Sequence, residues 1–511
     1  MRLILIMLVL SASYALNAQQ HDNTWVFGTL NDYFTINFNS EGPIMTVVDM
    51  PMELERASST ISNRDGELQY YTNGCSLLNY NHEVIEGGDV VNTGDEFNRW
   101  CGGDQWNEIG YYPGRFQSMV STPVPHKVDQ YYLLHKPHEW NDMPRLADKG
   151  EYVRSYLTTI DMAANNGEGE VVSKELYNIG LVEGPLSLNK HANGDDWWVI
   201  DPLLDSDIIS VWLLDSSGIH FSHEQQIGLI DSDSTRGFGH NAFSPDGQLF
   251  MKHAGNAGTQ LFDFDRTTGR LSNYRHVSFP EDDPLNDAYL GYGGVAVSPN
   301  GEMLYTSNAH RVYQYDLTAP DLEASRVLIG DIVSRQDTQR NPTSTIHMQL
   351  GPDCQLYVLP FKGNELHVIH NPNGRGAAAD WEAGAYRYPD EMFRDSPYFP
   401  NYRLGPLGDE GSPCVDYDAV SATEQDLPTE QLLTLYPNPT TGPVSLQLKE
   451  VLTHESRWTL RDARGRVVLT KLLQRGTTVA DVTASELPAG MYLWDLTGAS
   501  RQLSSGKLIV H

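Results

Sequence analysis

The stretch Gly239–His253, GHNAFSPDGQLFMKH, recurs along the chain with small changes. Related phrases are GGVAVSPNGEMLYTS from Gly293 and IHMQLGPDCQLYVLP from Ile346. Four copies align on one turn position, and successive copies are separated by 53, 54 and 53 residues; the turn residues are Gly194, Gly247, Gly301 and Cys354. A period near 50 residues indicates a propeller, a solenoid or another repeat array.

Each copy follows the same internal order of strands and turns. An alternating apolar run leads into a tight turn of the Asn/Asp-Gly type, and further β-rich runs follow, such as Leu249–Met251 and Thr259–Asp265, with a weaker run from Ser272. Four strands per repeat, with no helical periodicity between them, predict a propeller blade rather than a parallel βαβ unit.

Two more divergent copies come earlier, at Ala57–Asn81 with Gly66 in the turn and at Gln117–Pro137 with Asp129 near the turn. Residues 23–417 are predicted to form the propeller, and they span between seven and eight repeat intervals. We therefore expect seven blades, one built partly from the run at Trp25, with six or eight blades as the alternatives. Pairing of a strand from one terminus with the last blade is the expected closure, because it removes free sheet edges.

A second domain follows the repeats. Residues 418–430, DAVSATEQDLPTE, are polar, acidic and without periodicity, which is typical of a linker. Residues 431–511 contain short alternating strands separated by Gly, Pro and Asn turns, which predict a small Ig-like β-sandwich. The predicted fold class is therefore all-β, a β-propeller followed by this sandwich.

The N-terminus indicates an exported protein, and the net charge disfavours two classes of partner. Residues 1–18 are predicted to be a signal peptide, with Arg2, the apolar run Leu3–Leu10 and small residues leading to cleavage near Ala18. No later apolar run has the length of a membrane span, so no transmembrane segment is expected in the mature protein. The formal net charge of -32, from 67 acidic and 35 basic residues, disfavours nucleic acid and anionic membranes as partners.

The four cysteines, Cys75, Cys101, Cys354 and Cys414, contain no CxxC pair. An exported chain permits two disulfides; Cys75–Cys101 is the local choice, and the pairing is otherwise left open by the sequence.

Three motifs stand in order at the C-terminus: LYPNPTTGPVSL at Leu435–Leu446, LPAGMYLWDL at Leu487–Leu496 and the terminal GKLIVH. On these motifs the last 81 residues resemble the type A C-terminal sorting domain of the type IX secretion system. An ordinary accessory Ig-like module is the alternative. The motif residues carried over are Tyr436, Pro437, Asn438, Pro439, Gly442, Leu487, Pro488, Gly490, Tyr492 and Lys507.

This resemblance implies a route and partners. The signal peptide would bring the chain to the periplasm, and the type IX translocon and sorting machinery would take it across the outer membrane. The domain is usually cut off there, and the cargo is released or joined to surface lipopolysaccharide.

The repeat region also resembles WD40-like propellers among cargo proteins of the same secretion system. Phrases such as LQYYTNGCSLLNYNHEVI, FSPDGQLF and MLYTSNAHRVYQYDL carry this similarity, which covers most of residues 25–402. It implies a fold and no particular activity, because one scaffold can host many functions.

Motifs of enzyme and cofactor chemistry are absent from the sequence. There is no HExxH, GxSxG, P-loop, zinc-type Cys–His spacing or EF-hand loop. GFGHNA at Gly237 and GYGGVA at Gly291 contain the glycines of a nucleotide fingerprint without its strand-then-helix context, and we interpret them as part of the repeat. No cofactor, no metal and no catalytic residue is predicted.

One position of the repeat gives a candidate site on the propeller axis. Residues seven before the turn position are small, polar or His, whereas those six and four before it are mostly apolar. Strand alternation sends the two sets to different sides, so the polar set is expected to ring the channel near its mouth. The predicted ligand-binding ring is Ser59, Thr122, Ser187, His240 and His347, with Gly294 at the same level. The alternative is a water-filled channel without a ligand.

A second candidate is the insertion Gly87–Phe116, which interrupts the repeat with aromatic and acidic residues. Long irregular loops on rigid scaffolds often carry binding residues, and aromatic faces beside carboxylates suit sugar recognition. The predicted ligand-binding residues are Trp100, Trp106, Tyr111, Tyr112 and Arg115. The alternative is a loop that packs its aromatic side chains against one end of the ring.

These features favour a secreted or cell-surface binding or adhesion protein whose ligand is a glycan, a peptide or a partner protein. One alternative is an extracellular polysaccharide- or peptide-degrading hydrolase or lyase with its site on the propeller face. Another is a structural component of a cell-surface assembly.

Overall fold

The computed structural model divides the chain into two compact units, residues 1–417 and residues 418–511. The residues that it describes are 19–29, 32–40, 42–54, 57–101, 112, 117–139, 151–204, 206–228, 239–254, 258–280, 293–308, 310–332, 344–361, 363–392, 398–415, 433–449, 451–452, 456–461, 467–483, 487–488, 490–498 and 501–510. The predicted signal peptide and the predicted linker lie outside the described residues.

The described residues of the first unit form seven antiparallel sheets, each from one continuous stretch of chain. The first sheet contains β1 (Thr24–Thr29), β2 (Asp32–Asn37) and β3 (Ile44–Val48), and the second contains β4 (Ser59–Ser62), β5 (Leu68–Thr72) and β6 (Leu77–Asn79). The third contains β7 (Met119–Pro123), β8 (Gln130–His135), β10 (Glu151–Asp161) and β11 (Glu170–Val182), with β9 (His138–Glu139) beside β10.

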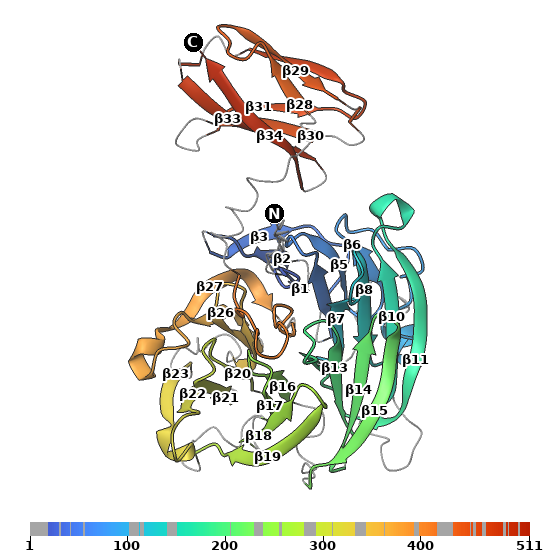
Figure 1. Ribbon diagram of the computed structural model, residues 1–511, viewed down its shortest axis with the longest axis vertical. Helices are drawn as coiled ribbons and strands as arrows, with labels where there is room; N and C mark the ends of the chain where they lie inside the picture. The colour runs from blue at the N-terminus through green and yellow to red at the C-terminus, as the bar shows by residue number, and fades with distance from the viewer. Residues whose placement is uncertain are drawn as a thin grey trace, which may run out of the picture. The chain divides into compact units, whose positions relative to one another are not determined.

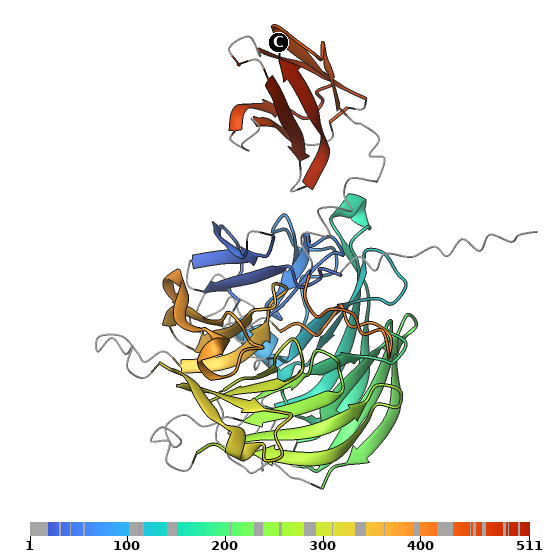
Figure 2. The same cartoon turned by 60° about the vertical axis from the view of Figure 1, so that its left-hand side comes forward.

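The remaining four sheets each have four strands in sequence order. They are β12 (Ser187–Lys190), β13 (Trp197–Pro202), β14 (Ile208–Asp215) and β15 (Gly218–Gln226); then β16 (His240–Phe243), β17 (Leu249–Ala254), β18 (Gly258–Asp265) and β19 (Arg270–Val277); then β20 (Val295–Val297), β21 (Met303–Ser307), β22 (Arg311–Asp316) and β23 (Val327–Asp331); and finally β24 (Ser344–Leu350), β25 (Leu356–Phe361), β26 (Gly363–Ile369) and β27 (Trp381–Met392). Successive sheets surround a common centre (Figure 1), and Figure 2 shows the same sheets in an oblique view. This is the predicted seven-bladed β-propeller.

One turn shapes most of the blades. The turn residue between the first two strands has a positive φ in each aligned copy: 88° at Gly66, 82° at Gly194, 69° at Gly247, 76° at Gly301 and 65° at Cys354. Its backbone N–H donates to the carbonyl three residues earlier, as Gly247 does to Ser244 at 2.8 Å. Glycine adopts this backbone conformation at the lowest cost, which explains why the copies align on it.

Apolar side chains fill the spaces between blades. Leu188, Val295 and Met348, all six residues before their turn positions, are 1%, 0% and 2% exposed. Met348 belongs to a buried cluster that joins β20–β22 of the sixth blade to β24–β26 of the seventh. The prediction is confirmed for these positions six before the turn. Of the positions four before it, Val297 is buried, whereas Phe243 and Leu350 are half-buried.

The ring closes by side-chain packing. Trp25 of β1 lies with its ring centroid 5.2 Å from that of Tyr357 in β25, and 5.7 Å from that of Phe399. Phe38 contacts the same Tyr357 ring at 5.6 Å. The expected exchange of a terminal strand is wrong for the described residues, because the first and last sheets each use only their own consecutive strands. Aromatic burial between blades one and seven replaces the missing strand pairing.

Residues 398–415, which we call the strap, cross the end of the propeller where the repeated turns lie. Asn401 Nδ2 donates to the Pro245 carbonyl at 2.8 Å, and the Tyr402 hydroxyl donates to the Ser121 carbonyl at 2.7 Å. The backbone N–H of Leu407 bonds the Ala192 carbonyl at 2.9 Å. These contacts anchor the strap on three different blades.

Two further links fasten the strap. The Arg403 guanidinium binds both carboxylate oxygens of Asp22, at 2.6 and 2.7 Å, and this bidentate pair is almost completely buried. The disulfide Cys354–Cys414 joins the turn of the seventh blade to the end of the strap, and the second disulfide is Cys75–Cys101. The strap therefore connects the N-terminal segment to the last blade.

The second unit is a two-sheet sandwich. One sheet contains β28 (Leu433–Tyr436), β29 (Pro443–Leu448) and β32 (Val479–Thr483), and the other contains β31 (Val467–Leu473), β30 (Ser456–Arg461), β33 (Gly490–Gly498) and β34 (Arg501–Val510). Its buried cluster takes residues from both sheets and includes Leu446, Trp458 and Leu496. The unit therefore has a core of its own.

We expect Trp25→Ala to lower the free energy of unfolding of the propeller by about 3–5 kcal/mol, because it leaves a large cavity at the closure. Phe221→Ala, at a side chain that is 55% exposed on β15, is the matched control and should cost far less. Urea unfolding of the mature chain measures both values. Equal losses for the two variants would contradict closure through Trp25.

Candidate functional site: the propeller axis

The predicted axial ring is buried. Ser59 and Ser187 are 2% and 0% exposed, Thr122 is 0% exposed, and His240 and His347 are each 2% exposed. The Ser59 hydroxyl bonds the Ser121 hydroxyl at 2.8 Å. These residues therefore lie in packed protein rather than at an open channel mouth, and their predicted role in ligand binding stays a prediction.

His240 and His347 meet across the axis. Their rings are stacked with centroids 4.5 Å apart and planes 25° apart, although a whole blade separates them in sequence. That intervening blade places Gly294 at the same level, where a Cβ atom would stand 2.5 Å from the Met348 backbone nitrogen. The missing side chain at Gly294 lets the inner strands approach and brings the two imidazoles together.

Burial sets the protonation of this pair. It holds the pKa of His240 well below its usual range, and the neighbouring His347 and His253 add repulsion. Burial also lowers the pKa of His347 to about 3 and that of His253 to about 4. His240 Nδ1 accepts a hydrogen bond from the Val295 backbone N–H at 3.1 Å. Imidazoles with such low pKa values are poorly matched to general-base catalysis near neutral pH.

Gln117 ties three blades together near the axis. Its side-chain amide donates to the carbonyls of Leu186 at 2.8 Å and Asn241 at 2.7 Å, and its oxygen accepts from the Asn241 N–H at 3.1 Å. The Tyr398 ring of the strap packs edge-on against His240 at 6.2 Å. Gln117 was not predicted from the sequence, because it precedes the aligned inner strand; its positive φ of 59° is a structural observation.

A small cavity remains between the strap and the inner strands β12, β16, β20 and β24. Its volume is about 70 Å³, and its lining includes Asn189, His240, Gln349, Tyr398, Asn401 and Arg403. Pockets for small organic ligands usually measure roughly 300–1,000 Å³. Gln349 bonds the Phe399 backbone through both its amide nitrogen and its oxygen. The cavity is too small for a sugar ring, and these polar groups hold the strap.

Buried charges lie near the C-terminal ends of the second strands, away from the repeated turns. Lys136 Nζ lies 2.6 Å from Asp201 Oδ1, and both side chains are completely buried. Lys252 Nζ contacts Glu183 Oε1 at 2.6 Å, and Lys136 also donates to the Glu183 carbonyl at 2.8 Å. This network was not predicted from the sequence. Its signal was a pair of opposite charges seven residues after the turn position in neighbouring repeats, namely Lys136 and Asp201.

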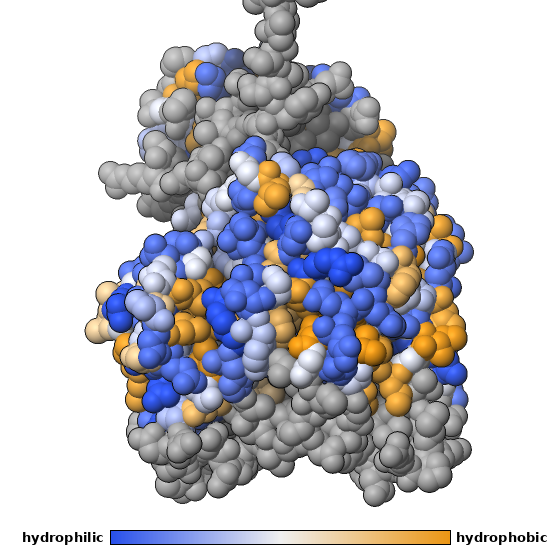
Figure 3. All heavy atoms as spheres, turned by 60° about the horizontal axis from the view of Figure 1, so that its bottom comes forward, coloured by the Kyte–Doolittle hydropathy of each residue, from blue (hydrophilic) through white to orange (hydrophobic). Residues whose placement is uncertain are grey.

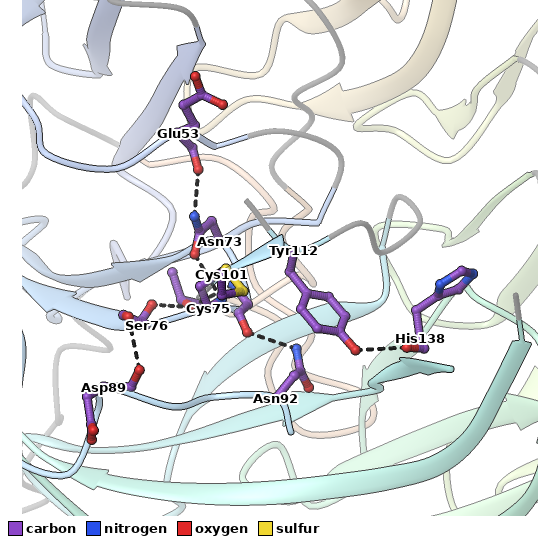
Figure 4. The surroundings of a disulfide bond; sticks show 11 residues. Glu53, Asn73, Cys75, Ser76, Asp89, Asn92, Cys101, Tyr112 and His138 are labelled. Atoms are coloured by element: carbon purple, nitrogen blue, oxygen red, sulfur yellow. Dashed lines mark hydrogen bonds between the residues drawn. A yellow bond between two sulfur atoms is a disulfide. The ribbon is translucent and has the colours of Figure 1, made fainter. Parts of the chain in front are cut away.

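The insertion is anchored at its start. The disulfide Cys75–Cys101 holds the short helix α1 (Asp95–Trp100) beside the second blade (Figure 4). Asn92 Nδ2 donates to the Gly74 carbonyl at 3.1 Å, and the Tyr112 hydroxyl donates to the His138 carbonyl at 2.9 Å.

The predicted loop residues fall into three groups. Tyr112 is 0% exposed, so it acts as an anchor of the insertion. Trp100 is half-buried, and the Arg99 guanidinium lies 5.4 Å from its ring centroid. Trp106, Tyr111 and Arg115 lie outside the described residues. Of the set, Trp100 is the described residue that retains exposed surface for a ligand.

The predicted sorting motif brings the two ends of the sandwich together. Asn438 Nδ2 donates to the Lys507 carbonyl at 2.6 Å, and its oxygen accepts from the Ile509 N–H at 2.9 Å. The Gly442 N–H bonds the Thr440 hydroxyl at 3.0 Å. These contacts attach the Tyr436–Gly442 segment to the last strand.

The remaining motif residues lie around β33. The Tyr492 hydroxyl donates to the Pro488 carbonyl at 2.7 Å, and Leu487 packs against the core. Gly490 begins β33, and Tyr436 is 70% exposed. Pro437 and Pro439 both follow cis peptide bonds.

Within the described ranges, no group of three His, Cys, Asp or Glu side chains is placed to hold a metal ion. In that part of the chain, none of the helices combines the length and apolar character needed to cross a membrane.

Comparison with known families matches residues 434–511 to the secretion system C-terminal sorting domain. The match supports the predicted type IX sorting signal, so the chain is exported through the periplasm and is secreted or displayed at the cell surface. Comparison with curated proteins gives no match.

Solved structures resemble the propeller distantly. A gluconolactonase from Xanthomonas campestris is 14% identical, covers 68% of this chain and 90% of its own, and gives a TM-score of 0.30. Saccharomyces cerevisiae Sqt1 is 9% identical over 71% and 80% of the two chains, with a TM-score of 0.35. The Dos1 propeller is 13% identical over 64% and 70%, with a TM-score of 0.34. Likeness at this level carries no inference about this chain.

We expect the free energy of unfolding to fall as the pH falls from 7 to 5. An unfolded His has a pKa of about 6.5, whereas the folded pKa values are about 4 for His21 and His253 and about 3 for His347. The unfolded state therefore binds more protons, and each such His lowers stability by roughly 1.4 kcal/mol per pH unit between about 6.5 and its folded pKa.

Urea unfolding of the mature chain at several pH values measures this slope. His347→Gln should reduce the slope of stability against pH by roughly 1.4 kcal/mol per pH unit, the contribution of about one proton. His220→Gln, at a side chain that is 51% exposed, is the control for the same substitution at the surface. An unaltered slope in His347→Gln would show that His347 titrates alike in both states.

Proposed function

We propose that this chain is an extracellular binding protein whose propeller presents its outer surface to a glycan, a peptide or a partner protein. The observation that supports this most is the filled axis. Among the described residues, neutral His residues, Gln117 and the strap occupy the place where a propeller can hold a small substrate, and they leave a cavity of about 70 Å³. A ligand of useful size would therefore bind outside the axis.

The outer surface offers polar area and anchored loops. Figure 3 shows one side of the first unit, on which hydrophilic residues predominate and hydrophobic residues form small groups between them. The insertion is fixed at Cys101 by its disulfide, so α1 and Trp100 are presented on a rigid base. Rigid presentation lowers the entropy lost when a ligand binds.

Retention of the mature chain on immobilised polysaccharides and glycopeptides, with released product recorded in the same samples, tests this function. We expect retention without product. Trp100→Ala should weaken retention about five- to tenfold, the loss expected for one aromatic stacking contact. Phe221→Ala, an exposed aromatic on β15, is the matched control and should retain full binding.

Other outcomes point elsewhere. Released product would favour a hydrolase or lyase. Equal retention of the Trp100→Ala and Phe221→Ala variants would remove the insertion from the binding site. No retention on any probe, together with co-purification at fixed stoichiometry, would favour a structural component of a surface assembly.

We further propose that residues 1–18 are the export signal and that residues 431–511 are removed at the cell surface. Deletion of residues 431–511 removes the sorting signal and should leave the propeller in the periplasm. The truncated propeller should still fold, because the strap and both disulfides remain in it. Cell fractionation and the intact mass of the surface form measure these outcomes. Normal surface levels of the truncated chain, or a surface form with its full-length mass, would contradict the respective proposal.

A further inference from the structure

The second unit differs in charge from the rest of the chain. Residues 431–511 contain nine Lys and Arg and six Asp and Glu, whereas residues 1–430 contain 26 basic and 61 acidic residues. A small cationic unit is therefore joined to a strongly anionic propeller. Such an asymmetry orients the approach of a charged partner over distances comparable with the Debye length.

The basic side chains gather on the outer side of the four-stranded sheet. In β30, Arg457 and Arg461 are exposed, whereas the alternate residues Trp458 and Leu460 are 0% and 1% exposed. In β34, Lys507 is exposed beside the fully buried Leu508. Strand alternation thus places all three cations on the face that points away from the core.

Two leucines share this face. Leu493 in β33 is 53% exposed between the buried Tyr492 and Trp494, and Leu472 in β31 is 48% exposed. The register sets Leu493 directly between Arg461 and Lys507, and it sets Leu472 opposite Arg457. The two rows are four residues apart along β30, or about 13 Å. We call Arg457, Arg461, Leu472, Leu493 and Lys507 the cationic face.

Asp495 is the acidic residue on this side of β33, and its Oδ1 lies 3.4 Å from Arg461 Nε. It neutralises part of one cation, so the described residues of the face remain net positive.

The opposite sheet has a different surface. Its outward positions form the rows Thr434–Gln447–Val479 and Tyr436–Ser445–Asp481, which contain one carboxylate and no basic residue. The concentration of charge on one side is therefore not a general property of this sandwich.

We propose that the cationic face docks on an acidic protein surface of the export machinery. Charge complementarity favours an acidic partner. The anionic propeller repels such a partner, whereas the cationic second unit attracts it. The partner therefore binds this chain through the second unit. The exposed leucines favour a protein over a sugar or lipid phosphate, because a protein can cover Leu472 and Leu493 with apolar side chains while pairing the cations at the rim. This inference is independent of the ligand of the propeller.

Charge reversal in the full chain tests the proposal. We expect Arg461→Glu/Lys507→Glu to lower the extracellular amount at least tenfold, with accumulation in the periplasm. The matched control is Lys449→Glu/Arg475→Glu, which alters the net charge equally at two exposed residues that are not among the five that define the face. Thermal unfolding of both purified variants checks that the sandwich remains folded.

Carbodiimide cross-linking, which joins an amine to a carboxylate without a spacer, gives a second readout. We expect an adduct between this chain and an envelope protein that is lost in Lys507→Arg, because arginine keeps the charge and lacks the reactive amine. If the charge-reversed chain does not fold, Lys507→Arg still tests the proposal, because it keeps the positive charge of the face. Flotation with phosphatidylglycerol vesicles provides the lipid arm.

Two results would overturn the proposal. The first is equal export of the charge-reversed and control variants, with the adduct unchanged in Lys507→Arg. The second is binding to phosphatidylglycerol vesicles that Arg461→Glu/Lys507→Glu abolishes, which would assign the cationic face to a lipid headgroup. Loss of export confined to the face variant, together with loss of the adduct in Lys507→Arg, would support it.

Discussion

The seven blades form a ring through the aromatic contact of Trp25 with Tyr357 and Phe399, which joins the first blade to the last. No shared strand reinforces this junction in the described residues, so dispersion and apolar burial must hold it. The strap supplies the rest, because Arg403 pairs with Asp22 at one end and Cys414 is bonded to Cys354 at the other. The strap also contacts the described inner strands at the axis, where the Tyr398 ring packs against His240.

The described residues at the axis connect the blades, and ligand recognition is proposed to lie on the outer surface. His240, a member of the predicted ring, accepts a hydrogen bond from the Val295 backbone. Gln117, which was not predicted from the sequence, bonds two other blades. The buried Lys136–Asp201 pair adds a charged connection between the third and fourth blades. Removing one partner of such a pair leaves an uncompensated buried charge and destabilises the fold. These residues can therefore change little without loss of stability. Exposed loops and outer strands carry no such constraint, and they are where recognition can vary.

The repeat turn made most of the fold predictable. Its position requires a positive φ, and glycine at Gly194, Gly247 and Gly301 displays that requirement in the sequence. Strand alternation likewise identified the apolar inter-blade set. The site was less predictable, because the His240–His347 stack depends on the absent side chain of Gly294 and on a strap more than fifty residues away in sequence. Ring closure also escaped prediction, since aromatic packing between distant residues leaves no periodic signal.

The central claim is that the strap permanently covers a packed axis. Hydrogen exchange of the backbone amides of the mature chain at pH 7, followed by mass spectrometry, tests it most directly. The account predicts that amides of the strap such as Phe399 and Leu407 exchange as slowly as those of the inner strands β16 and β24, because both open only when the propeller unfolds. Exchange of the strap orders of magnitude faster than that of the inner strands would contradict the account and would reopen the axis as a binding site.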